Sequence, residues 1–353
     1  MPSQMAKLQN LPLFDQYASR GATIVIAVSG GGDSMALLDL YRIAKSQNVN
    51  LPNPIAVTID HGLREGFAGE AAIVEAYCAQ HNLPWRLLRW EGDKPKTGIM
   101  AAARLARYGL LADAAETVDA KIILTGHTLD DQHETATMRR ARGVASQMES
   151  DVVFQRLALI SRPLLTVTRA DLRTHLVAEN NIAFADDPTN ENMQYERARV
   201  RKDSSGTVVP KIDLYTGADL AKPAAAFVEE NIKRDGDLVI IQRPQVHNRD
   251  AEIFALRYLA ATLGGFDYPA SLTSGERLVD LLNISHKGEA FTAQRCCFTR
   301  IAGGVSVAPE ARHKERAWLT GKVFPFETFC AKSMMPLANA LAKLTDAKAF
   351  LMP

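Results

Sequence analysis

The chain has 353 residues, of which 47% are apolar and 23% are charged, values typical of a folded globular protein and not of a disordered one. Its 41 lysine and arginine residues balance 40 aspartate and glutamate residues, which excludes a strongly basic nucleic-acid binder. If the protein binds a polyanion, local clusters of basic residues would have to bind it. At roughly 100–200 residues per domain, the length predicts two domains.

The four cysteines, Cys78, Cys296, Cys297 and Cys330, form no CxxC pair. This spacing argues against a disulfide framework and against a zinc site, and it favours a reducing, cytoplasmic location. No run of about 18 apolar residues is present, so we expect no membrane span. The first 16 residues lack the apolar core of a secretion signal.

Strands and helices alternate through the first half of the chain. Apolar and β-branched runs predict strands at 23–29, 54–60, 85–90 and 121–126, and helical spacing predicts helices at 34–45, 70–81, 99–117 and 130–142. Four such alternations predict an α/β fold, with a parallel sheet that helices cover on both faces.

The pattern changes after about residue 160. Helices are predicted at 168–179, 251–263 and 275–282, short strands around a Gly-Gly turn at 290–309, and a last helix within 324–344. The polar stretch KDSSGT places a domain boundary near residue 203. We therefore expect a catalytic domain at 1–202 and a second, smaller, mostly helical substrate domain at 203–353.

The most informative stretch is AVSGGGDSMALL, residues 27–38, between a predicted strand and a predicted helix. Consecutive glycines let backbone N–H groups approach an anion, and the helix N-terminus favours phosphate. Hydroxyl groups can add hydrogen bonds, and the carboxylate of Asp33 can bring Mg²⁺ to the phosphates. The residues that this argument assigns to phosphate binding are Ser29, Gly30, Gly31, Gly32, Asp33 and Ser34.

Other glycine loops fit this stretch less well. A Walker A loop requires a lysine after the glycines, and the dinucleotide motif requires GxGxxG, and neither is present here. The simplest alternative is a tight strand-to-helix turn in which Asp33 or Ser34 caps the helix.

SGGGDS resembles the pyrophosphate-binding loop of the PP-loop ATP pyrophosphatases, whose fold is the adenine nucleotide α hydrolase-like fold. The resemblance implies that the loop holds the pyrophosphate of ATP while a substrate oxygen attacks the α-phosphate. An adenylated intermediate then loses AMP to a nucleophile.

Further segments narrow the resemblance to the tRNA(Ile)-lysidine synthase family. These segments, in chain order, are DHGLR (60–64), MAAARLARY (100–108), LTGHTLDDQHET (124–135), SRPLL (161–165) and DDPTNENMQYERARVR (186–201). The resemblance implies that ATP adenylates the C2 oxygen of the wobble cytidine in a CAU anticodon, after which the ε-amine of free lysine displaces AMP. It implies ATP and Mg²⁺ as cofactors and tRNA(Ile) and lysine as partners, and a homodimer is compatible with it.

Asp130 and Glu134 lie four residues apart, on one face of a predicted helix that follows a strand. Open α/β sheets build their sites at that end of a strand. The two carboxylates could bind Mg²⁺, bind the lysine ammonium or accept its proton. We assign Asp130 the catalytic or metal role and Glu134 the lysine contact. The alternative is that Asp130 and Asp131 cap the helix, and for Asp131 this alternative is favoured.

Two histidines and two arginines are further candidates. His61 follows the second strand and is assigned to ATP, with turn formation as the alternative, and His127 follows the fourth strand. Arg104 and Arg107, three residues apart on one helix, could reach phosphate or the activated cytosine, or form a solvated basic face.

Two basic clusters could contact tRNA phosphates, because nucleic-acid affinity rests largely on such charges. Arg139, Arg140 and Arg142 form the first, and Arg197, Arg199, Arg201 and Lys202 the second. Within the second, Arg197 matches an arginine of the family's Y-x-R-N-x-x-R segment and is assigned a catalytic role. Ala198 stands where the family has asparagine, which puts the local geometry in doubt.

Two other classes of protein remain open. A sulfur-inserting tRNA enzyme with the same loop would need reactive cysteines, and the first domain has only Cys78, in a helical pattern. A non-catalytic nucleotide- or RNA-binding module would not need both SGGGDS and the carboxylates. Only about 45 residues follow Pro309, so we expect the chain to lack the full C-terminal domain of the family.

Overall fold

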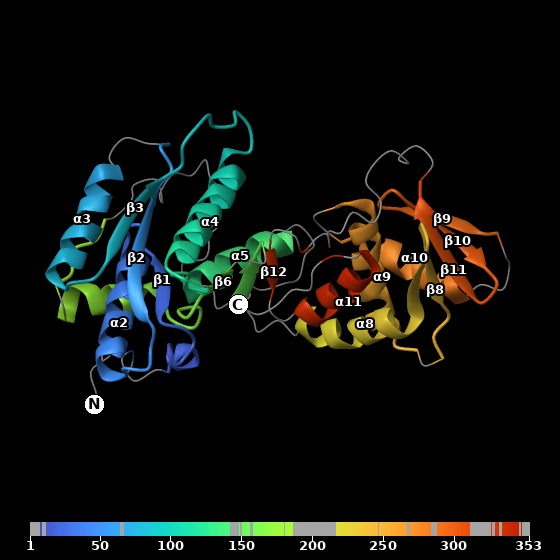
Figure 1. Ribbon diagram of the computed structural model, residues 1–353, viewed down its shortest axis with the longest axis horizontal. Helices are drawn as coiled ribbons and strands as arrows, with labels where there is room; N and C mark the ends of the chain where they lie inside the picture. Colours follow the sequence, from blue (N-terminus) through green and yellow to red (C-terminus); the bar gives the residue numbers. More distant parts are fainter. Residues whose placement is uncertain are drawn as a thin grey trace. The chain divides into compact units, whose positions relative to one another are not determined.

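The computed structural model describes residues 8, 12–63, 67–141, 148, 150–155, 158–179, 181–185, 217–245, 247–266, 269–283, 288–310, 326, 329–331, 334–345 and 347 (Figure 1). The chain divides into two compact units. Met1–Val152 and Leu157–Ile212 make up the first, and Val153–Arg156 and Asp213–Met352 the second. The predicted boundary at residues 202 and 203 lies outside the described residues.

The first unit is built on a parallel sheet. Its neighbouring strands are β6 (Ala158–Ser161), β4 (Ile122–Thr125), β1 (Thr23–Ala27), β2 (Asn53–Asp60) and β3 (Trp85–Arg89), in that order, and each neighbouring pair is parallel. Ala27, the last residue of β1, pairs with Val57 of β2 and with Thr125, the last residue of β4. The loops after these strands therefore leave the same edge of the sheet.

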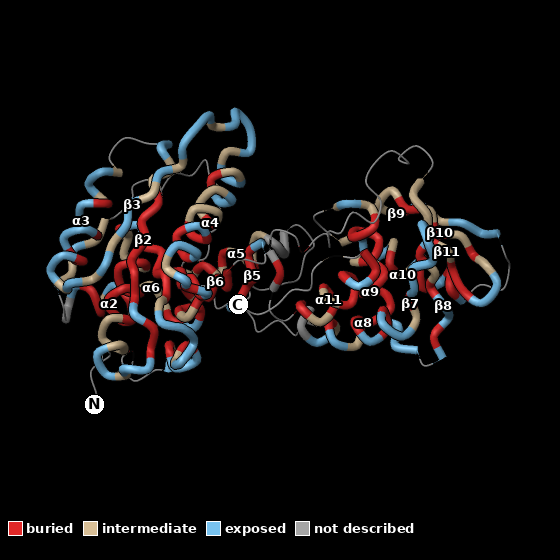
Figure 2. The backbone as a smooth tube through the Cα atoms, viewed as in Figure 1, coloured by how far each residue is buried: buried red, intermediate tan, exposed pale blue. Residues whose placement is uncertain are grey.

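Helices α2 (Gly32–Gln47), α3 (Phe67–Gln80), α4 (Ile99–Thr117) and α5 (Leu129–Ala141) follow the strands in alternation. The centre of the sheet is buried, whereas β3 is largely exposed (Figure 2). Strands and helices predicted from 23 to 141 are thus confirmed as an α/β parallel-sheet unit. Sequence analysis assigned no element to β5 (Asp151–Phe154) or β6.

The helix predicted at 168–179 is in two parts. α6 (Arg169–Thr174) is α-helical, and His175–Glu179 continues as a π-helix, labelled η2. Such wide turns are rare and occur mostly as single-turn insertions in α-helices. Here the first residue of the wide turn is His175, which is buried against α2.

The second unit combines helices with an antiparallel sheet. In its described part, the helices are α8 (Gly217–Asn231), α9 (Arg249–Gly264), α10 (Leu272–Asn283) and α11 (Met335–Thr345). The sheet has the order β7 (Ile232–Asp235), β8 (Leu238–Gln242), β11 (Gly304–Pro309), β10 (Cys296–Ile301), β9 (Ala290–Ala293). The residues of this unit also include the short strand β12 (Phe329–Ala331), which is not a strand of this sheet. The predicted helices and the strands around the Gly-Gly turn are confirmed. Sequence analysis did not assign α8, which contains Pro223, a residue that usually ends helices.

No helix in the described part of the chain is long and apolar enough to cross a membrane.

A buried polar network ties α2 to its neighbours. Asp39 is completely buried and accepts hydrogen bonds from His175 Nε2 (2.7 Å), Tyr77 Oη (2.5 Å) and Arg42 Nη2 (2.6 Å). Burial by itself raises the pKa of Asp39, but these hydrogen bonds outweigh it and lower the pKa to about 2. Asp39 therefore stabilises the fold as a carboxylate, and it joins α2, α3 and the π-helical turn.

Replacing Asp39 by asparagine is expected to lower the free energy of unfolding by about 2 kcal/mol at pH 7. The native pKa lies below the unfolded value, so the contribution is complete above about pH 4 and disappears as pH falls through about 2. Urea unfolding of both proteins between pH 2 and pH 7 should show the difference shrinking on acidification. An asparagine variant of exposed Asp113 is the control, and a pH-independent difference for Asp39 would contradict the prediction.

Candidate active site at the carboxyl edge of the parallel sheet

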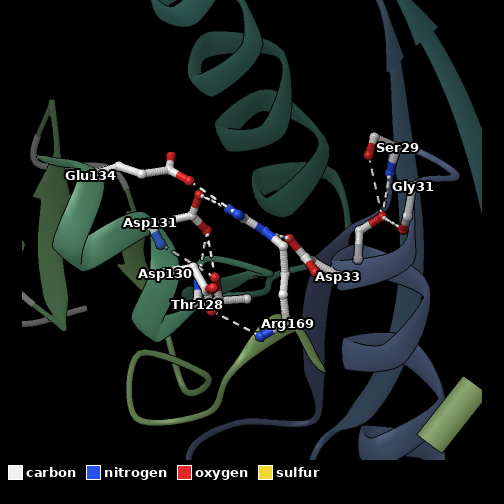
Figure 3. A network of polar contacts seen from close by, with 9 residues as sticks. Ser29, Gly31, Asp33, Thr128, Asp130, Asp131, Glu134 and Arg169 are labelled. Carbon is white, nitrogen blue, oxygen red and sulfur yellow. Dashed lines mark hydrogen bonds and ion pairs between the residues drawn. The ribbon is translucent and has the colours of Figure 1, made fainter. Parts of the chain in front are cut away.

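The glycine loop connects β1 to α2 and is closed by its own serines (Figure 3). The backbone N–H of Ser29 donates to Ser34 Oγ at 3.1 Å, and Ser34 Oγ donates to the carbonyl of Gly31 at 2.9 Å. The two serine hydroxyls lie 3.2 Å apart. The serines therefore hold the loop as a compact turn above the end of β1.

The N-terminus of α2 has no capping side chain. The cap residue is Gly31, in extended conformation, and neither Asp33 nor Ser34 occupies that position. The alternative in which one of them caps the helix is therefore wrong. A helix that leaves its first N–H groups without a side-chain acceptor offers them, together with its dipole, to an anion.

Close backbone packing holds the loop from two sides. Gly30 has a φ of +86°, and a Cβ there would lie 2.7 Å from the carbonyl oxygen of Glu70. Its own carbonyl accepts the N–H of Ala185 at 2.9 Å. Gly126, at the end of β4, lets the loop approach, because a Cβ there would lie 3.0 Å from the backbone oxygen of Asp33. A Cβ at Gly30 would thus force the backbone to move, and one at Gly126 would require the loop to shift by a few tenths of an ångström.

The acidic face of α5 lies beside the loop. Thr128 directly precedes the helix. Its backbone N–H donates to Asp131 Oδ2 at 2.8 Å, and its hydroxyl donates to the same oxygen at 3.0 Å. In return, the backbone N–H of Asp131 donates to Thr128 Oγ1 at 3.4 Å. Thr128 and Asp131 therefore form a reciprocal capping box, which gives Asp131 the capping role that the sequence favoured. Asp130 does not cap it, because Asp130 Oδ2 accepts the backbone N–H of Arg169, at 2.9 Å.

Arg169 joins the two acidic elements (Figure 3). Its Nε donates to Asp33 Oδ2 at 3.0 Å, its Nη1 to Glu134 Oε1 at 3.0 Å and its Nη2 to Asp131 Oδ1 at 2.6 Å. All three guanidinium nitrogens thus contact carboxylates, from the glycine loop on one side and from α5 on the other. The structure brings together Asp33, Asp130 and Glu134, which the sequence analysis assigned to the site.

The electrostatics of this cluster follow from burial and from crowding of like charges. Burial raises the pKa of Asp33, the Arg169 guanidinium opposes that rise, and Asp131 and Asp130 add to it. For Arg169, burial lowers the pKa, but Asp131, Glu134 and Asp33 outweigh burial and raise it. The guanidinium therefore stays charged beside these carboxylates.

The sequence analysis missed Arg169. The sequence feature that could have identified it is its position, because Arg169 is the first residue of α6 and directly follows the helix cap Thr168. A positive charge opposes the helix dipole at an N-terminus, so an arginine there needs a compensating partner. The partners are acidic residues more than 30 positions away, and no local pattern identifies them.

The predicted arginines of α4 surround a buried tyrosine. Arg104 Cζ lies 5.0 Å and Arg107 Cζ 5.8 Å from the ring centroid of Tyr108. Burial raises the pKa of the Tyr108 phenol, but Arg107, Arg104 and the buried Arg162 outweigh burial and lower the pKa. Positive charge is therefore concentrated here, and Arg162, from the SRPLL segment, is a member that the sequence analysis did not assign.

The two histidines follow the two strands that flank β1, at the same edge as the glycine loop. His61 follows β2, and its ring meets Trp90 edge-on with centroids 6.4 Å apart. His127 follows β4, and its Nδ1 lies 2.9 Å from Thr125 Oγ1. This placement agrees with the expectation that the carboxyl ends of parallel strands form the site.

The remaining predicted residues cannot be placed. Arg142, Arg197 and Ala198 lie outside the described residues, as do Arg199, Arg201 and Lys202. Arg139 and Arg140 lie in α5, but the described part of the structure does not include their side chains.

The carboxylates supply the oxygen donors that Mg²⁺ prefers, but they are not arranged as a metal site. Among the described residues, no group of three or more His, Cys, Asp and Glu side chains is positioned to hold a metal ion. Three of the carboxylates point instead to the Arg169 guanidinium. The protein alone therefore offers no ready-made divalent cation site in this part of the chain.

A parallel sheet, a glycine loop that leads into an uncapped helix, and acidic residues at the same edge define a PP-loop protein. The family model described as a PP-loop domain matches residues 3–207, which is more than half of the chain. Within this class, the chain belongs to the tRNA(Ile)-lysidine synthase family, because it is similar to curated members of that family over most of its length.

Two of these relatives show the extent of the similarity. The tRNA(Ile)-lysidine synthase of Bradyrhizobium sp. is 43% identical over 329 residues, which cover 85% of this chain and 91% of the relative. That of Rhizobium meliloti is 37% identical over 314 residues, which cover 82% of this chain and 68% of the relative. Among solved structures, the tRNA thiolase NcsA from Methanococcus maripaludis is 13% identical with a TM-score of 0.47, covering 58% of this chain and 73% of that one.

Proposed function

We propose that this protein joins free lysine to C2 of the wobble cytidine in tRNA(Ile) with a CAU anticodon. The C2 oxygen attacks the α-phosphate of ATP and pyrophosphate leaves. The lysine ε-amine then bonds to C2, loses a proton, and AMP leaves with the oxygen. The observation that carries this proposal is the acidic cluster of α5 held beside an uncapped PP-loop, in a member of this family.

The first half-reaction is assigned to the PP-loop. The N–H groups at the start of α2, with the hydroxyls of Ser29 and Ser34, bind the pyrophosphate, and His61 lies at the same edge to contact ATP. Mg²⁺ usually keeps phosphate and water ligands and takes only one or two carboxylates. We assign those carboxylates to Asp33 and Asp130, which would hold the metal, and the metal would offset the charge of the ATP phosphates.

The second half-reaction is assigned to the acidic face of α5. The amine of lysine is protonated near neutral pH and has to lose a proton before it can attack. We assign binding of the ammonium group to Glu134, whose side chain is only 4% exposed, and the catalytic role to Asp130, which lies on the same helix. A buried carboxylate binds a cation more strongly than an exposed one, because less solvent screens the charges.

The basic residues are assigned to the tRNA. Arg104 and Arg107, beside Tyr108, provide concentrated positive charge for a phosphate or for the adenylated base. Arg139 and Arg142 are proposed as further tRNA contacts because they belong to a basic cluster in the sequence, and Arg197 is proposed as a catalytic residue on the resemblance. A cytoplasmic location and a homodimer also remain predictions from the sequence.

Pyrophosphate release from ATP tests the proposal. Release should require lysine and tRNA(Ile) with a CAU anticodon together, and mass spectrometry of the digested tRNA should show one lysine added with loss of water. A matched tRNA with a GAU anticodon is the control. Release that needs neither substrate, or that needs a sulfide donor, would contradict the proposal.

Thiolation is not favoured. Cys78 is the cysteine of the first unit, and it is buried within α3 at 2% exposure. Burial raises the pKa of its thiol to about 11, so the thiolate that sulfur transfer requires is scarce at neutral pH.

A further inference from the structure

A short strap of chain, residues 182–185, borders the glycine loop beside the first turn of α2. The N–H of Ile182 donates to the carbonyl of Leu176 at 2.8 Å, which ties the start of the strap to the π-helical turn η2. The residue before Leu176 in that turn is His175, whose Nε2 lies 2.7 Å from Asp39 Oδ2 on α2. The strap is therefore anchored, through this turn, to the buried network of α2.

The end of the strap orients one peptide group of the loop. Ala185 pairs with Gly31 in a parallel bridge, and its N–H donates to the carbonyl of Gly30 at 2.9 Å. The carbonyl of Gly30 and the N–H of Gly31 belong to the same planar trans peptide, so they point in opposite directions. Holding the carbonyl on the strap therefore directs the Gly31 N–H away from the strap. Gly31 is the cap residue of α2, so this N–H lies at the helix end that attracts anions.

The ring of Phe184 packs against the first residue of α2. A Cβ at Gly32 would lie 3.3 Å from Phe184 Cδ2 and 3.6 Å from its Cε2, with Leu176 Cδ1 at 3.8 Å. Glycine in a helix costs roughly 1 kcal/mol relative to alanine. Here the missing side chain lets the ring approach the backbone of the first turn. Phe184 is half-buried, so the packed part of its ring fixes one flank of the loop.

We propose that the Phe184 ring and the backbone N–H of Ala185 hold the PP-loop in its anion-binding form, which makes Phe184 a positioning residue for ATP. This inference rests on the proposed function, because that function assigns the pyrophosphate of ATP to the loop. Glycines reach many backbone conformations, so a loop without the strap would spend part of its time in forms whose N–H groups do not converge on one phosphate. The apparent affinity for ATP would fall with the fraction of molecules in the binding form.

Calorimetric titration of ATP with Mg²⁺ into the full chain tests the proposal without lysine or tRNA. Phe184→Ala should weaken ATP binding on the order of 10-fold, and Ala185→Pro, which removes the N–H, should weaken it by a similar factor. Phe184→Tyr keeps the ring and should bind ATP as the wild type does. Trp85→Ala is the matched control, because it removes a half-buried aromatic side chain from the start of β3, at the opposite end of the parallel strands from the loop.

Steady-state kinetics separate positioning from a general loss of structure. In the pyrophosphate assay, Phe184→Ala should raise the KM for ATP and leave the KM for lysine unchanged, because the strap contacts the loop assigned to ATP. A smaller folded fraction would instead lower kcat and leave both KM values unchanged.

Wild-type affinity for ATP in folded Phe184→Ala and Ala185→Pro proteins overturns the proposal. Equal weakening in Trp85→Ala overturns it as well, because destabilisation of the unit would then be sufficient. If thermal unfolding shows that Phe184→Ala is not folded, Phe184→Leu takes its place, since it removes the ring and keeps an apolar side chain. A wild-type protein that binds no ATP overturns the proposed function together with this inference, whereas unchanged affinity in the variants leaves the proposed function standing.

Discussion

Asp33→Ala is expected to lower lysine- and tRNA-dependent pyrophosphate release on the order of 100-fold or more, the scale on which loss of one transition-state contact acts. Asp33 lies in the first turn of α2, within the loop assigned to pyrophosphate. It also accepts the hydrogen bond from Arg169 Nε that links the guanidinium to that loop. The variant therefore loses both a carboxylate for the metal carried by ATP and the link from the loop to α5.

The measurement is a continuous pyrophosphate assay at saturating lysine and tRNA, with the KM for ATP determined separately. Asp113→Ala on α4 removes an exposed carboxylate from the same unit and should leave the rate unchanged. Thermal unfolding should show that Asp33→Ala remains folded, because Glu134 and Asp131 still hold Arg169. Unchanged turnover in a folded Asp33→Ala protein would refute the role of Asp33 in the ATP site.

The features that the sequence predicted correctly are those with a local pattern. β1 and β2 show as apolar β-branched runs, and the position of the loop after β1 follows from the order of elements. That Asp33, Asp130 and Glu134 share one edge follows from parallel topology, because the loops after neighbouring strands leave the same side.

The parts that were missed depend on long-range pairing. Arg169 is 136 residues from Asp33 and 35 from Glu134, and its role arises only when α2, α5 and α6 pack together. The buried pair of Asp39 and His175 is likewise formed across 136 residues and requires the π-helical turn. Periodicity detects which face of an element is apolar, but it does not identify the partner of a buried charge.

The glycine loop itself gives the last prediction. Gly30→Ala is expected to weaken ATP binding strongly and to lower the free energy of unfolding by about 1–3 kcal/mol through backbone strain, since its φ is +86°. Close contact adds to this cost, because the new Cβ would lie 2.7 Å from the backbone oxygen of Glu70 and real Cβ atoms do not approach so closely. The loop therefore has to move, and its bond to the N–H of Ala185 is lost with it.

Gly21→Ala separates strain from displacement of the loop. Gly21 has a similar φ of +96°, but a Cβ there meets nothing within 4 Å. It should lose stability of the same order by chemical denaturation and keep the wild-type affinity for ATP in calorimetric titration. Gly30→Ala should lose both, because the N–H groups at the start of α2 can bind phosphate only while the loop holds its closed form. Equal ATP affinities in the two variants would mean that the exact path of the loop does not determine phosphate binding.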